Sequence, residues 1–334
     1  MTAMLDRPSD VDDGLTPERL LRAYRTMKSI RMFEDRVHDE FATGDIPGFV
    51  HLYAGEEASA AGICAHLDED RDTIASTHRG HGHCIAKGVD IKPMMAEIFG
   101  RTTGSCRGKG GSMHIADLSK GMLGANGIVG GGPPLICGAA LTAKTLKTGG
   151  VAIAFVGDGG SNQGTTFESY NLAKVWNLPA IFVVEDNGYA ESTGSAWSVG
   201  GSQLGRAEGF GMPGHQVDGT DFFAVYEVAR EVIERARSGG GPSLVHVKLN
   251  RYFGHFEGDA MTYRAPDEVA KVRATKDPLQ IFRQRVVEAA LLEPEDLDRI
   301  DSEVKSHIDQ VTVEAKAAAM PTEKDLLTDV YVSY

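Results

Sequence analysis

Two oxygen-bearing side chains follow two apolar runs of strand length. Asp158 comes directly after VAIAFV (151–156), and Asn187 comes shortly after AIFVVE (180–185). In open parallel sheets, ligands bind in the crevice beyond the carboxyl ends of the strands. If the two runs are neighbouring parallel strands, both side chains therefore reach the same crevice.

The Asp158 carboxylate indicates what kind of ligand this crevice takes. A carboxylate in the glycine loop 157–160 would repel a bare diphosphate, whereas a divalent cation between the two anions reverses the sign of the interaction. Mg²⁺ prefers hard oxygen ligands and often joins one or two protein oxygens to a phosphate. Asp158, the amide oxygen of Asn187 and a backbone carbonyl near Tyr189 would supply that set. The alternative is a plain turn in which Asp158 caps a helix.

Two other functions can be weighed against a magnesium–diphosphate site. An NAD-dependent dehydrogenase would use the loop after the first apolar run, but Asn162 stands where the third glycine of the dinucleotide motif belongs. The Asp158 carboxylate is also unsuited to a bare pyrophosphate. A non-catalytic scaffold subunit would have no need of the Asp158 and Asn187 pair.

The elements that must position these residues alternate between helix and strand. The spacing of apolar residues predicts helices at 17–43, 55–66, 91–99, about 134–147, 161–177 and 222–237, and helical structure from 277 to about 318. Strands are predicted at 151–156, 180–185 and 243–249. This alternation predicts an α/β fold: a doubly wound, mostly parallel sheet flanked by helices, with N- and C-terminal helical extensions. The Gly-rich stretch 100–134 has no clear periodicity and is expected to be an ordered ligand loop.

Composition bounds the class of protein. The 334 residues, 42% of them hydrophobic, suit one domain at 17–334, with a core at about 60–270 and a helical extension at about 277–334. We expect residues 1–16 to form a disordered tail. A net charge of −13 is unsuited to nucleic acid or to an anionic membrane, and no apolar run is long enough to span a bilayer. The four cysteines form no CxxC pair, so we expect reduced thiols. The acidic, polar segment 1–14 has neither the apolar core of a signal peptide nor the Arg-rich character of a transit peptide, so we expect a cytoplasmic protein.

Six motifs in order resemble one family along the chain from about residue 17 to its end. They are GFVHLYAGEEA (48–58), THRGHG (77–82), GKGGSMH (108–114), GANGIVG (124–130), the GDG of 157–159 with the later Asn187, and YFGHFEGDAMTYR (252–264). Together they are similar to the α subunits of the thiamine-diphosphate-dependent 2-oxo-acid and acetoin dehydrogenase complexes. The resemblance implies a thiamine-diphosphate-binding fold with thiamine diphosphate and Mg²⁺ as cofactors.

The resemblance also implies roles for individual residues. Asp158, Asn187 and the carbonyl of Tyr189 match metal ligands, and Arg79 matches an arginine that contacts the diphosphate, with His78 beside it. Gly127 and Val129 match a segment near the pyrimidine ring of the cofactor. Gly157, Gly159 and Gly160 match the loop that binds the diphosphate. Phe49 and His51 match residues that line the substrate side, and His255 matches an active-site histidine on a mobile loop.

The histidines can also be weighed without the family. Thiazolium chemistry produces alkoxide and enamine intermediates, so proton donors such as His51 and His255 near the reacting carbon would assist it. The run HRGHGH, with His78, His81 and His83, lacks a carboxylate or cysteine at short spacing to complete a transition-metal set. We therefore do not predict a metal site within that run.

The implied activity needs a second chain. The glutamate that activates thiamine comes, in the family, from a separate β subunit, and we expect an assembly of two α and two β chains. The loop 252–264 is most similar to acetoin dehydrogenase α subunits. The resemblance thus implies cleavage of acetoin to acetaldehyde, with the acetyl unit passed to lipoamide on an acyltransferase. The alternative is oxidative decarboxylation of pyruvate or a branched-chain 2-oxo acid.

Overall fold

The apolar runs form the centre of one parallel sheet. The structure is a computed structural model that describes residues 14–330. Its main sheet has six strands in the order β2-β1-β3-β4-β8-β7, and every pairing between them is parallel. The strands are β1 (Thr73–Ala75), β2 (Met122–Gly124), β3 (Ala152–Gly157), β4 (Ala180–Asp186), β7 (Gly214–Asp218) and β8 (Ser243–Lys248); β5 (Tyr189–Ala190) and β6 (Thr193–Gly194) form a separate antiparallel pair.

The register of β3 and β4 brings the two predicted ligand positions to one edge. The strands are paired from Ala152 with Ala180 to Gly157 with Glu185. Asp158 and Asn187 therefore leave the sheet side by side at its carboxyl edge. The prediction that the two apolar runs are neighbouring parallel strands is confirmed, as is the parallel strand predicted at 243–249, which pairs with β4.

Alternate residues of these strands face two hydrophobic clusters, because successive side chains of a strand point to opposite faces. Ile153, Phe155 and Val183 pack in a large cluster with the helices at the two ends of the chain. Ala154 and Phe182 pack on the other face, in a cluster that includes Tyr170. Strands buried on both faces explain why their sequences are apolar throughout.

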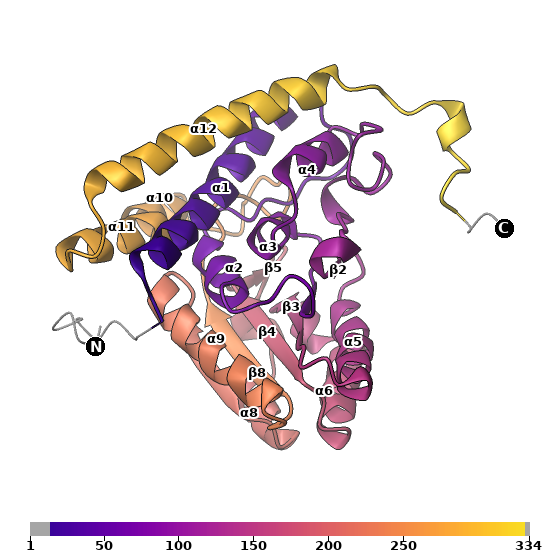
Figure 1. The fold of residues 1–334 in the computed structure, drawn as a ribbon, viewed down its shortest axis with the longest axis vertical. Coiled ribbons are helices and arrows are strands. Elements are labelled where there is room, and N and C mark those ends of the chain that lie inside the picture. The colour runs from indigo at the N-terminus through magenta and orange to yellow at the C-terminus, as the bar shows by residue number, and fades with distance from the viewer. Residues whose placement is uncertain (1–13, 331–334) are drawn as a thin grey trace.

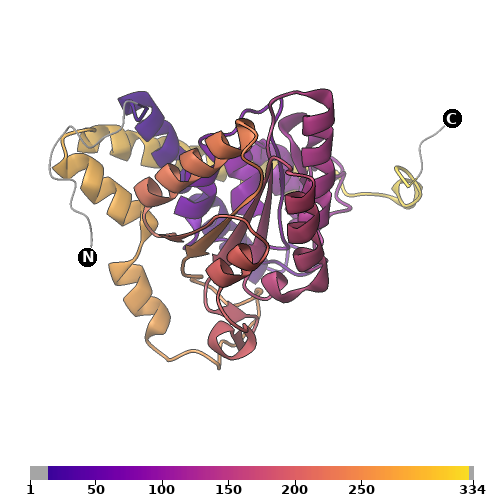
Figure 2. The ribbon, with the colours of Figure 1, turned by 90° about the horizontal axis from the view of Figure 1, so that it is seen from below.

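Twelve α-helices of the described residues surround the sheet. They are α1 (Pro17–Ala42), α2 (Glu57–Cys64), α3 (His81–Lys87), α4 (Ile91–Ile98), α5 (Gly132–Leu146), α6 (Gly164–Val175), α7 (Ser195–Ser198), α8 (Gln203–Gly209), α9 (Phe222–Arg237), α10 (Glu268–Thr275), α11 (Pro278–Glu288) and α12 (Pro294–Ala317). Figure 2 shows the sheet between α9 on one side and α5 and α6 on the other.

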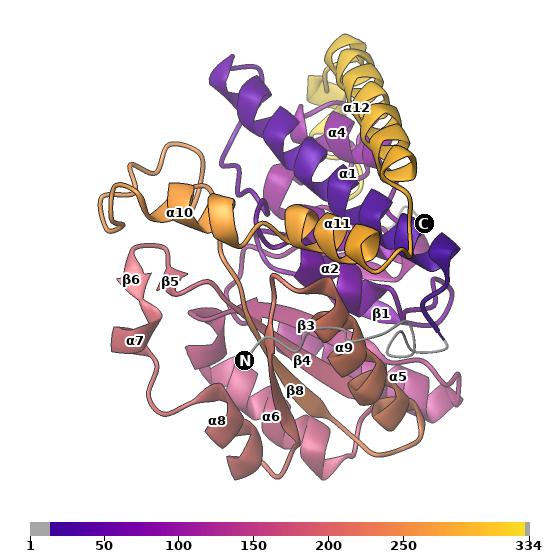
Figure 3. The same cartoon turned by 90° about the vertical axis from the view of Figure 1, so that its left-hand side faces the viewer.

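The predicted N- and C-terminal helical extensions form an outer layer. α12 lies along α1 and α4, and α1 packs in turn on α2 and α3 (Figure 1). Figure 3 shows this layer on the side of α2 that faces away from the sheet. The apolar stripe Ile300, Val304, Ile308, Val311 and Ala315 of α12 is buried. The α/β fold with a parallel sheet and helical extensions is therefore confirmed.

Some elements differ from the sequence prediction. β1, β2, β7 and α3 were not predicted, because strands of three to five residues and a seven-residue helix are too short for a clear period. The helix predicted from residue 161 begins at Gly164, after a 3₁₀ turn at Gly160–Asn162. The stretch 100–134 holds two further 3₁₀ turns, Gly111–Met113 and Leu118–Lys120, besides β2 and the start of α5.

The expected tail lies mostly outside the described residues. Residues 1–13 are not described, whereas Leu15 is buried and Thr16 caps α1 by accepting a hydrogen bond from the Arg19 amide. Among residues 14–330, no helix has both the length and the apolar character needed to cross a bilayer. The division into a core at about 60–270 and a C-terminal extension stays a prediction, as does the cytoplasmic location.

Candidate active site

A cavity of about 460 Å³ opens at the carboxyl ends of β3 and β4. Its walls come from segments far apart in the sequence: the loops before α2, α3 and α5, the loop after β3, the start of β5 and the loop after β8. Twelve of the thirteen residues singled out from the sequence line it. They are His51, His78, Arg79, Gly127, Val129, Gly157, Asp158, Gly159, Gly160, Asn187, Tyr189 and His255.

Phe49 is the predicted site residue that does not line this cavity. Its side chain is 62% exposed and meets the ring of Phe256 edge-on, with the ring centroids 5.6 Å apart. Phe256 in turn lies against His51, at 6.3 Å between centroids. Phe49 therefore belongs to the outer rim of the site, and its contact with a substrate stays a prediction.

The Asp158 carboxyl group is buried without a full set of partners. Its side chain is 3% exposed, and Oδ2 has no hydrogen-bond partner among the described residues. Burial, with a smaller contribution from Asp186, raises the pKa of Asp158 to about 6. Asp158 caps no helix, since Gly159 precedes the 3₁₀ turn and Gln163 precedes α6. A buried acceptor without a donor fits a cation as its missing partner.

Asn187 is held in place from two sides. Its Oδ1 accepts a hydrogen bond of 3.2 Å from the Tyr189 amide, and its Nδ2 donates to Glu56 Oε1 at 3.1 Å. An amide oxygen has two lone pairs, so Oδ1 can still accept a metal ion. Together with the unpaired Asp158 oxygen, Asn187 offers the hard oxygen ligands that suit Mg²⁺.

Glu56 and Glu185 line the same cavity and were not predicted. Glu185 ends the apolar run of β4 and accepts hydrogen bonds from Tyr53 and from Ser59, the latter at 2.6 Å. Burial and the nearby Glu185 raise the pKa of Glu56 well above its usual range. A sequence signal existed, because carboxylates inside GEEA and at the end of AIFVVE stand in otherwise apolar or small-residue surroundings.

Gly159 is required by a close contact with the β5 hairpin. A Cβ atom built on Gly159 would lie 2.7 Å from the Cβ of Ala190, closer than two carbon atoms can approach without movement. The loop that carries Asp158 and the turn that follows Asn187 can therefore pack together only because residue 159 has no side chain.

Arg79 enters the site from the segment between β1 and α3. Its guanidinium group donates to the Leu52 carbonyl at 2.5 Å and to the His255 carbonyl at 2.8 Å. Burial, together with the nearby Arg251, lowers the pKa of Arg79 to about 10. Since a guanidinium has five N–H donors, donors remain for an anion in the cavity.

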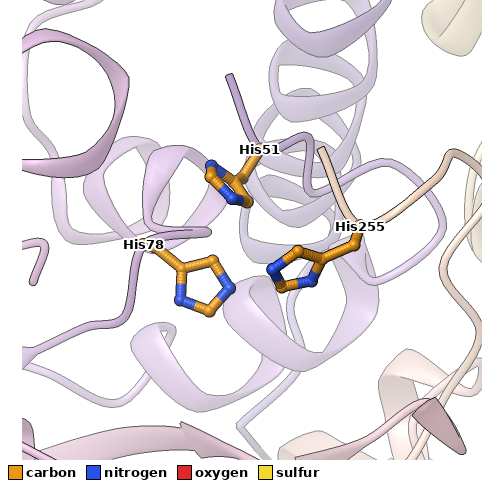
Figure 4. A group of neighbouring side chains, drawn as sticks. All are labelled: His51, His78 and His255. Carbon is orange, nitrogen blue, oxygen red and sulfur yellow. The ribbon is translucent and has the colours of Figure 1, made fainter. Parts of the chain in front are cut away.

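Three imidazole rings meet on one side of the cavity (Figure 4). The ring centroids of His51 and His78 are 4.7 Å apart, those of His51 and His255 are 5.0 Å apart, and those of His78 and His255 are 5.1 Å apart. Burial, followed by the positive charge of Arg79, lowers the pKa of each imidazole: to about 3 for His51, about 2 for His78 and about 4 for His255. All three rings are therefore neutral at pH 7.

The other two histidines of the HRGHGH run, His81 and His83, do not line the cavity. His81 contacts Glu34 through Nδ1 and Ser112 through Nε2, both at 2.9 Å. His83 contacts Ser76 through Nδ1 at 2.7 Å and Glu185 through Nε2 at 3.2 Å. Because α3 begins at His81, His78 lies in the preceding loop and points into the cavity, away from its neighbours in sequence.

Comparisons with known proteins agree with this geometry. Residues 25–324 match the family described as dehydrogenase E1 component. The chain is 63% identical to the α subunit of an acetoin:2,6-dichlorophenolindophenol oxidoreductase from Cupriavidus necator, and 55% identical to that of Bacillus subtilis, over 96% of both chains in each case. It is 39% identical to the pyruvate dehydrogenase E1 component subunit alpha of Zymomonas mobilis, over 94% of this chain and 89% of the relative. The chain therefore belongs to the dehydrogenase E1 component family.

Proposed function

We propose that this chain is the α subunit of a thiamine-diphosphate- and Mg²⁺-dependent enzyme that cleaves acetoin to acetaldehyde and passes the acetyl unit to lipoamide on an acyltransferase. The observation that carries the proposal is the buried Asp158 carboxylate, whose Oδ2 has no hydrogen-bond partner among the described residues, beside Asn187 at the ends of two neighbouring strands. Acetoin is favoured as the substrate because the two relatives that match at 63% and 55% identity are named for it.

Asp158, Asn187 and the Tyr189 carbonyl would hold Mg²⁺, and the glycine loop 157–160 would approach the diphosphate. Thiamine diphosphate would supply a nucleophilic carbon for the substrate carbonyl group and an electron-accepting ring for the electron pair left by C–C cleavage. The remaining N–H donors of Arg79 would bind diphosphate oxygens. Gly127 and Val129 would pack near the pyrimidine ring.

The neutral imidazoles would transfer protons on the substrate side. Cleavage of a hydroxyketone requires a proton donor at the ketone oxygen and a base at the neighbouring hydroxyl group. His51 and His255 lie close enough to act on the same small substrate, since their ring centroids are 5.0 Å apart. The His51 side chain is 7% exposed, so it is itself shielded from bulk water, whereas His78 and His255 are partly exposed.

A β subunit is part of the proposal, because it would supply the glutamate that activates the cofactor. We expect the isolated α chain to be inactive and a complex of two α and two β chains to be active. Oxidative decarboxylation of pyruvate or a branched-chain 2-oxo acid is the second candidate, supported by the more distant pyruvate dehydrogenase relatives. Decarboxylation comes second because those relatives are less identical to this chain than the acetoin relatives are. The family match gives no support to the alternative of an NAD-dependent dehydrogenase.

Thermal unfolding with thiamine diphosphate plus Mg²⁺ tests the cofactor site. A ligand at 100 times its Kd stabilises the folded protein by about 2.7 kcal/mol, and we expect Asp158→Asn to remove this stabilisation. The matched control is Asp39→Asn, on the exposed face of α1, which should respond like the wild type. Stabilisation by NAD and none by thiamine diphosphate would refute the proposal.

The activity itself is tested by co-expression with a candidate β subunit. Acetoin, pyruvate and branched 2-oxo acids are then compared as substrates with an artificial electron acceptor. We expect acetoin to be turned over with the highest kcat/KM, and only when both chains are present. Full activity of the isolated α chain would contradict the two-subunit site, and a preference for pyruvate would favour the second candidate.

A further inference from the structure

The three imidazoles of His51, His78 and His255 form a cluster of nitrogen donors, and among the described residues none of the three rings is hydrogen-bonded to a carboxylate. One ligand atom of each ring can be chosen so that all three lie within 4.8 Å of one another. The rings come from three separate segments, before α2, between β1 and α3, and after β8, and Figure 4 shows them pointing toward a common centre. Three donors from separate segments of the chain can approach an ion from three directions.

The cluster has unfilled coordination capacity. His51 is 7% exposed, yet its Nδ1 has no hydrogen-bond partner among the described residues. A buried nitrogen of this kind needs a donor, a water molecule or a cation. The ring contacts between the histidines are edge-on or tilted and satisfy no lone pair.

We propose that His51, His78 and His255 bind a divalent transition-metal ion of the Zn²⁺ or Co²⁺ class, at a site separate from the one assigned to Mg²⁺. Neutral imidazole is a good ligand for such ions, whereas Mg²⁺ prefers carboxylate, carbonyl and water oxygens. Three histidines would leave the fourth position of a tetrahedral ion open, and all three line the cavity.

The surrounding charges limit how tightly the ion binds. Arg79 donates to the His255 carbonyl, and Arg251 lines the same cavity, so two guanidinium groups repel a dication. Among the described residues no carboxylate belongs to the cluster itself, and Asp259, whose Oδ2 accepts a hydrogen bond from the His255 amide, is one negative charge against these two positive ones. We therefore expect reversible binding rather than a permanent structural metal.

The consequence for activity rests on the proposed function, whereas the binding itself does not. An ion at the three rings would occupy the space of a small ketone and take up the lone pairs needed for proton transfer. Zn²⁺ should therefore inhibit the assembled enzyme, in competition with the substrate, and a chelator should reverse the inhibition while Mg²⁺ is kept in excess.

Cobalt binding to the full-length chain tests the site directly, without cofactor and without turnover. We expect visible d–d absorption bands with the intensity of a four-coordinate Co²⁺ ion. We expect His78→Ala, His51→Ala and His255→Ala each to weaken Co²⁺ binding at least tenfold. Asp158→Asn should leave the cobalt bands unchanged, because it alters the oxygen site only. The matched control is His307→Ala, an exposed histidine of α12, which should also bind like the wild type.

If His78→Ala fails to fold, as judged by circular dichroism, His78→Gln replaces it in the titration. Absence of the four-coordinate bands, or bands that persist unchanged in folded His78 variants, would overturn the proposal. An enzyme that cleaves acetoin but binds no Co²⁺ at these rings contradicts the metal site alone. A chain that binds Co²⁺ through the three histidines but gives no acetoin cleavage with its β subunit contradicts only the proposed function and the inhibition that rests on it.

Discussion

Asn187 is oriented by a residue that belongs to another part of the chain. Glu56, in the turn before α2, accepts a hydrogen bond from Asn187 Nδ2 at 3.1 Å. This contact leaves the amide oxygen on the opposite side, where the proposed Mg²⁺ would lie. Partners that orient a metal ligand are worth about 10- to 100-fold in metal affinity.

We therefore predict that Glu56→Ala weakens Mg²⁺–thiamine diphosphate binding by roughly 10- to 100-fold. Glu56→Gln should bind nearly as the wild type, because the glutamine carbonyl can still accept from Asn187. Isothermal titration of the cofactor into saturating Mg²⁺ measures both variants. Equal losses in the two variants would show that Glu56 acts through its charge or its packing rather than through this hydrogen bond.

The neutral histidines make the stability of the unliganded chain depend on pH. Burial, helped by Arg79, lowers the pKa of His51 to about 3 in the folded chain, whereas the unfolded value is about 6.5. Between these values the unfolded chain binds a proton that the folded chain does not, so the free energy of unfolding falls as the pH drops below 6.5. Asp158 acts in the opposite direction, because its pKa is raised to about 6 by burial.

The contribution of a single histidine can be isolated by substitution. We predict that His51→Gln makes the free energy of unfolding less dependent on pH between 6.5 and 4.5, by up to about 1.4 kcal/mol per pH unit. Chemical denaturation at several pH values measures the slope of each protein. A variant slope as steep as that of the wild type would mean that His51 is protonated in the folded state.

At the scale of elements, one buried carboxylate organises the glycine-rich stretch before β2. Glu97, at the end of α4, is fully buried and accepts four backbone N–H bonds of 2.7–3.0 Å, from Cys106, Gly108, Gly110 and Gly111. Each of the two carboxylate oxygens accepts two of these hydrogen bonds. This explains how a segment without helical or strand periodicity can be ordered.

We predict that Glu97→Gln lowers the free energy of unfolding by roughly 3 kcal/mol, because the new NH₂ group cannot accept from the backbone donors it would face. Urea denaturation measures the loss, and limited proteolysis should show new cleavage between residues 100 and 114. The matched control is Glu168→Gln on the exposed face of α6, which should change stability by no more than about 0.5 kcal/mol. A stable Glu97→Gln chain would show that other contacts hold this segment.

At the scale of the whole molecule, the rim of the cavity carries exposed apolar side chains. Ile128 is 73% exposed and Val129 is 49% exposed, and Leu135 and Leu141 of the following helix, α5, are exposed as well. Exposed apolar side chains that gather on a surface mark protein–protein contacts. Since the proposed function requires a second chain to complete the cofactor site, we expect this rim to face the β subunit.

We predict that Leu135→Glu weakens assembly with the β subunit while leaving the fold of the α chain intact, because the side chain is at the surface. Analytical ultracentrifugation of the mixed chains measures assembly, and circular dichroism checks the fold. Val313→Glu, an exposed position on α12 in the outer layer, is the matched control and should assemble normally (Figure 1). Normal assembly of Leu135→Glu would place the β subunit on another face.

The sequence by itself determined the parallel sheet and one edge of the site. The runs 151–156 and 180–185 are apolar throughout because their strands are buried on both faces, so their type could be read without tertiary information. The types and positions of Asp158 and Asn187 then placed two oxygen-bearing side chains at neighbouring strand ends. The long helices α1 and α12 were equally predictable, since each has many turns over which its apolar stripe repeats.

Beyond what the family resemblance implied, only the tertiary structure decided which side chains from distant segments share the cavity. Glu56 reaches Asn187 across the sheet edge, and His51, His78 and His255 meet although they lie on three loops with no common period. Phe49 falls on the rim for the same reason, since the packing of its loop decides where it points. Local periodicity reports which face of an element is buried, but contacts between loops depend on how the whole chain packs, and no pattern within one segment encodes them.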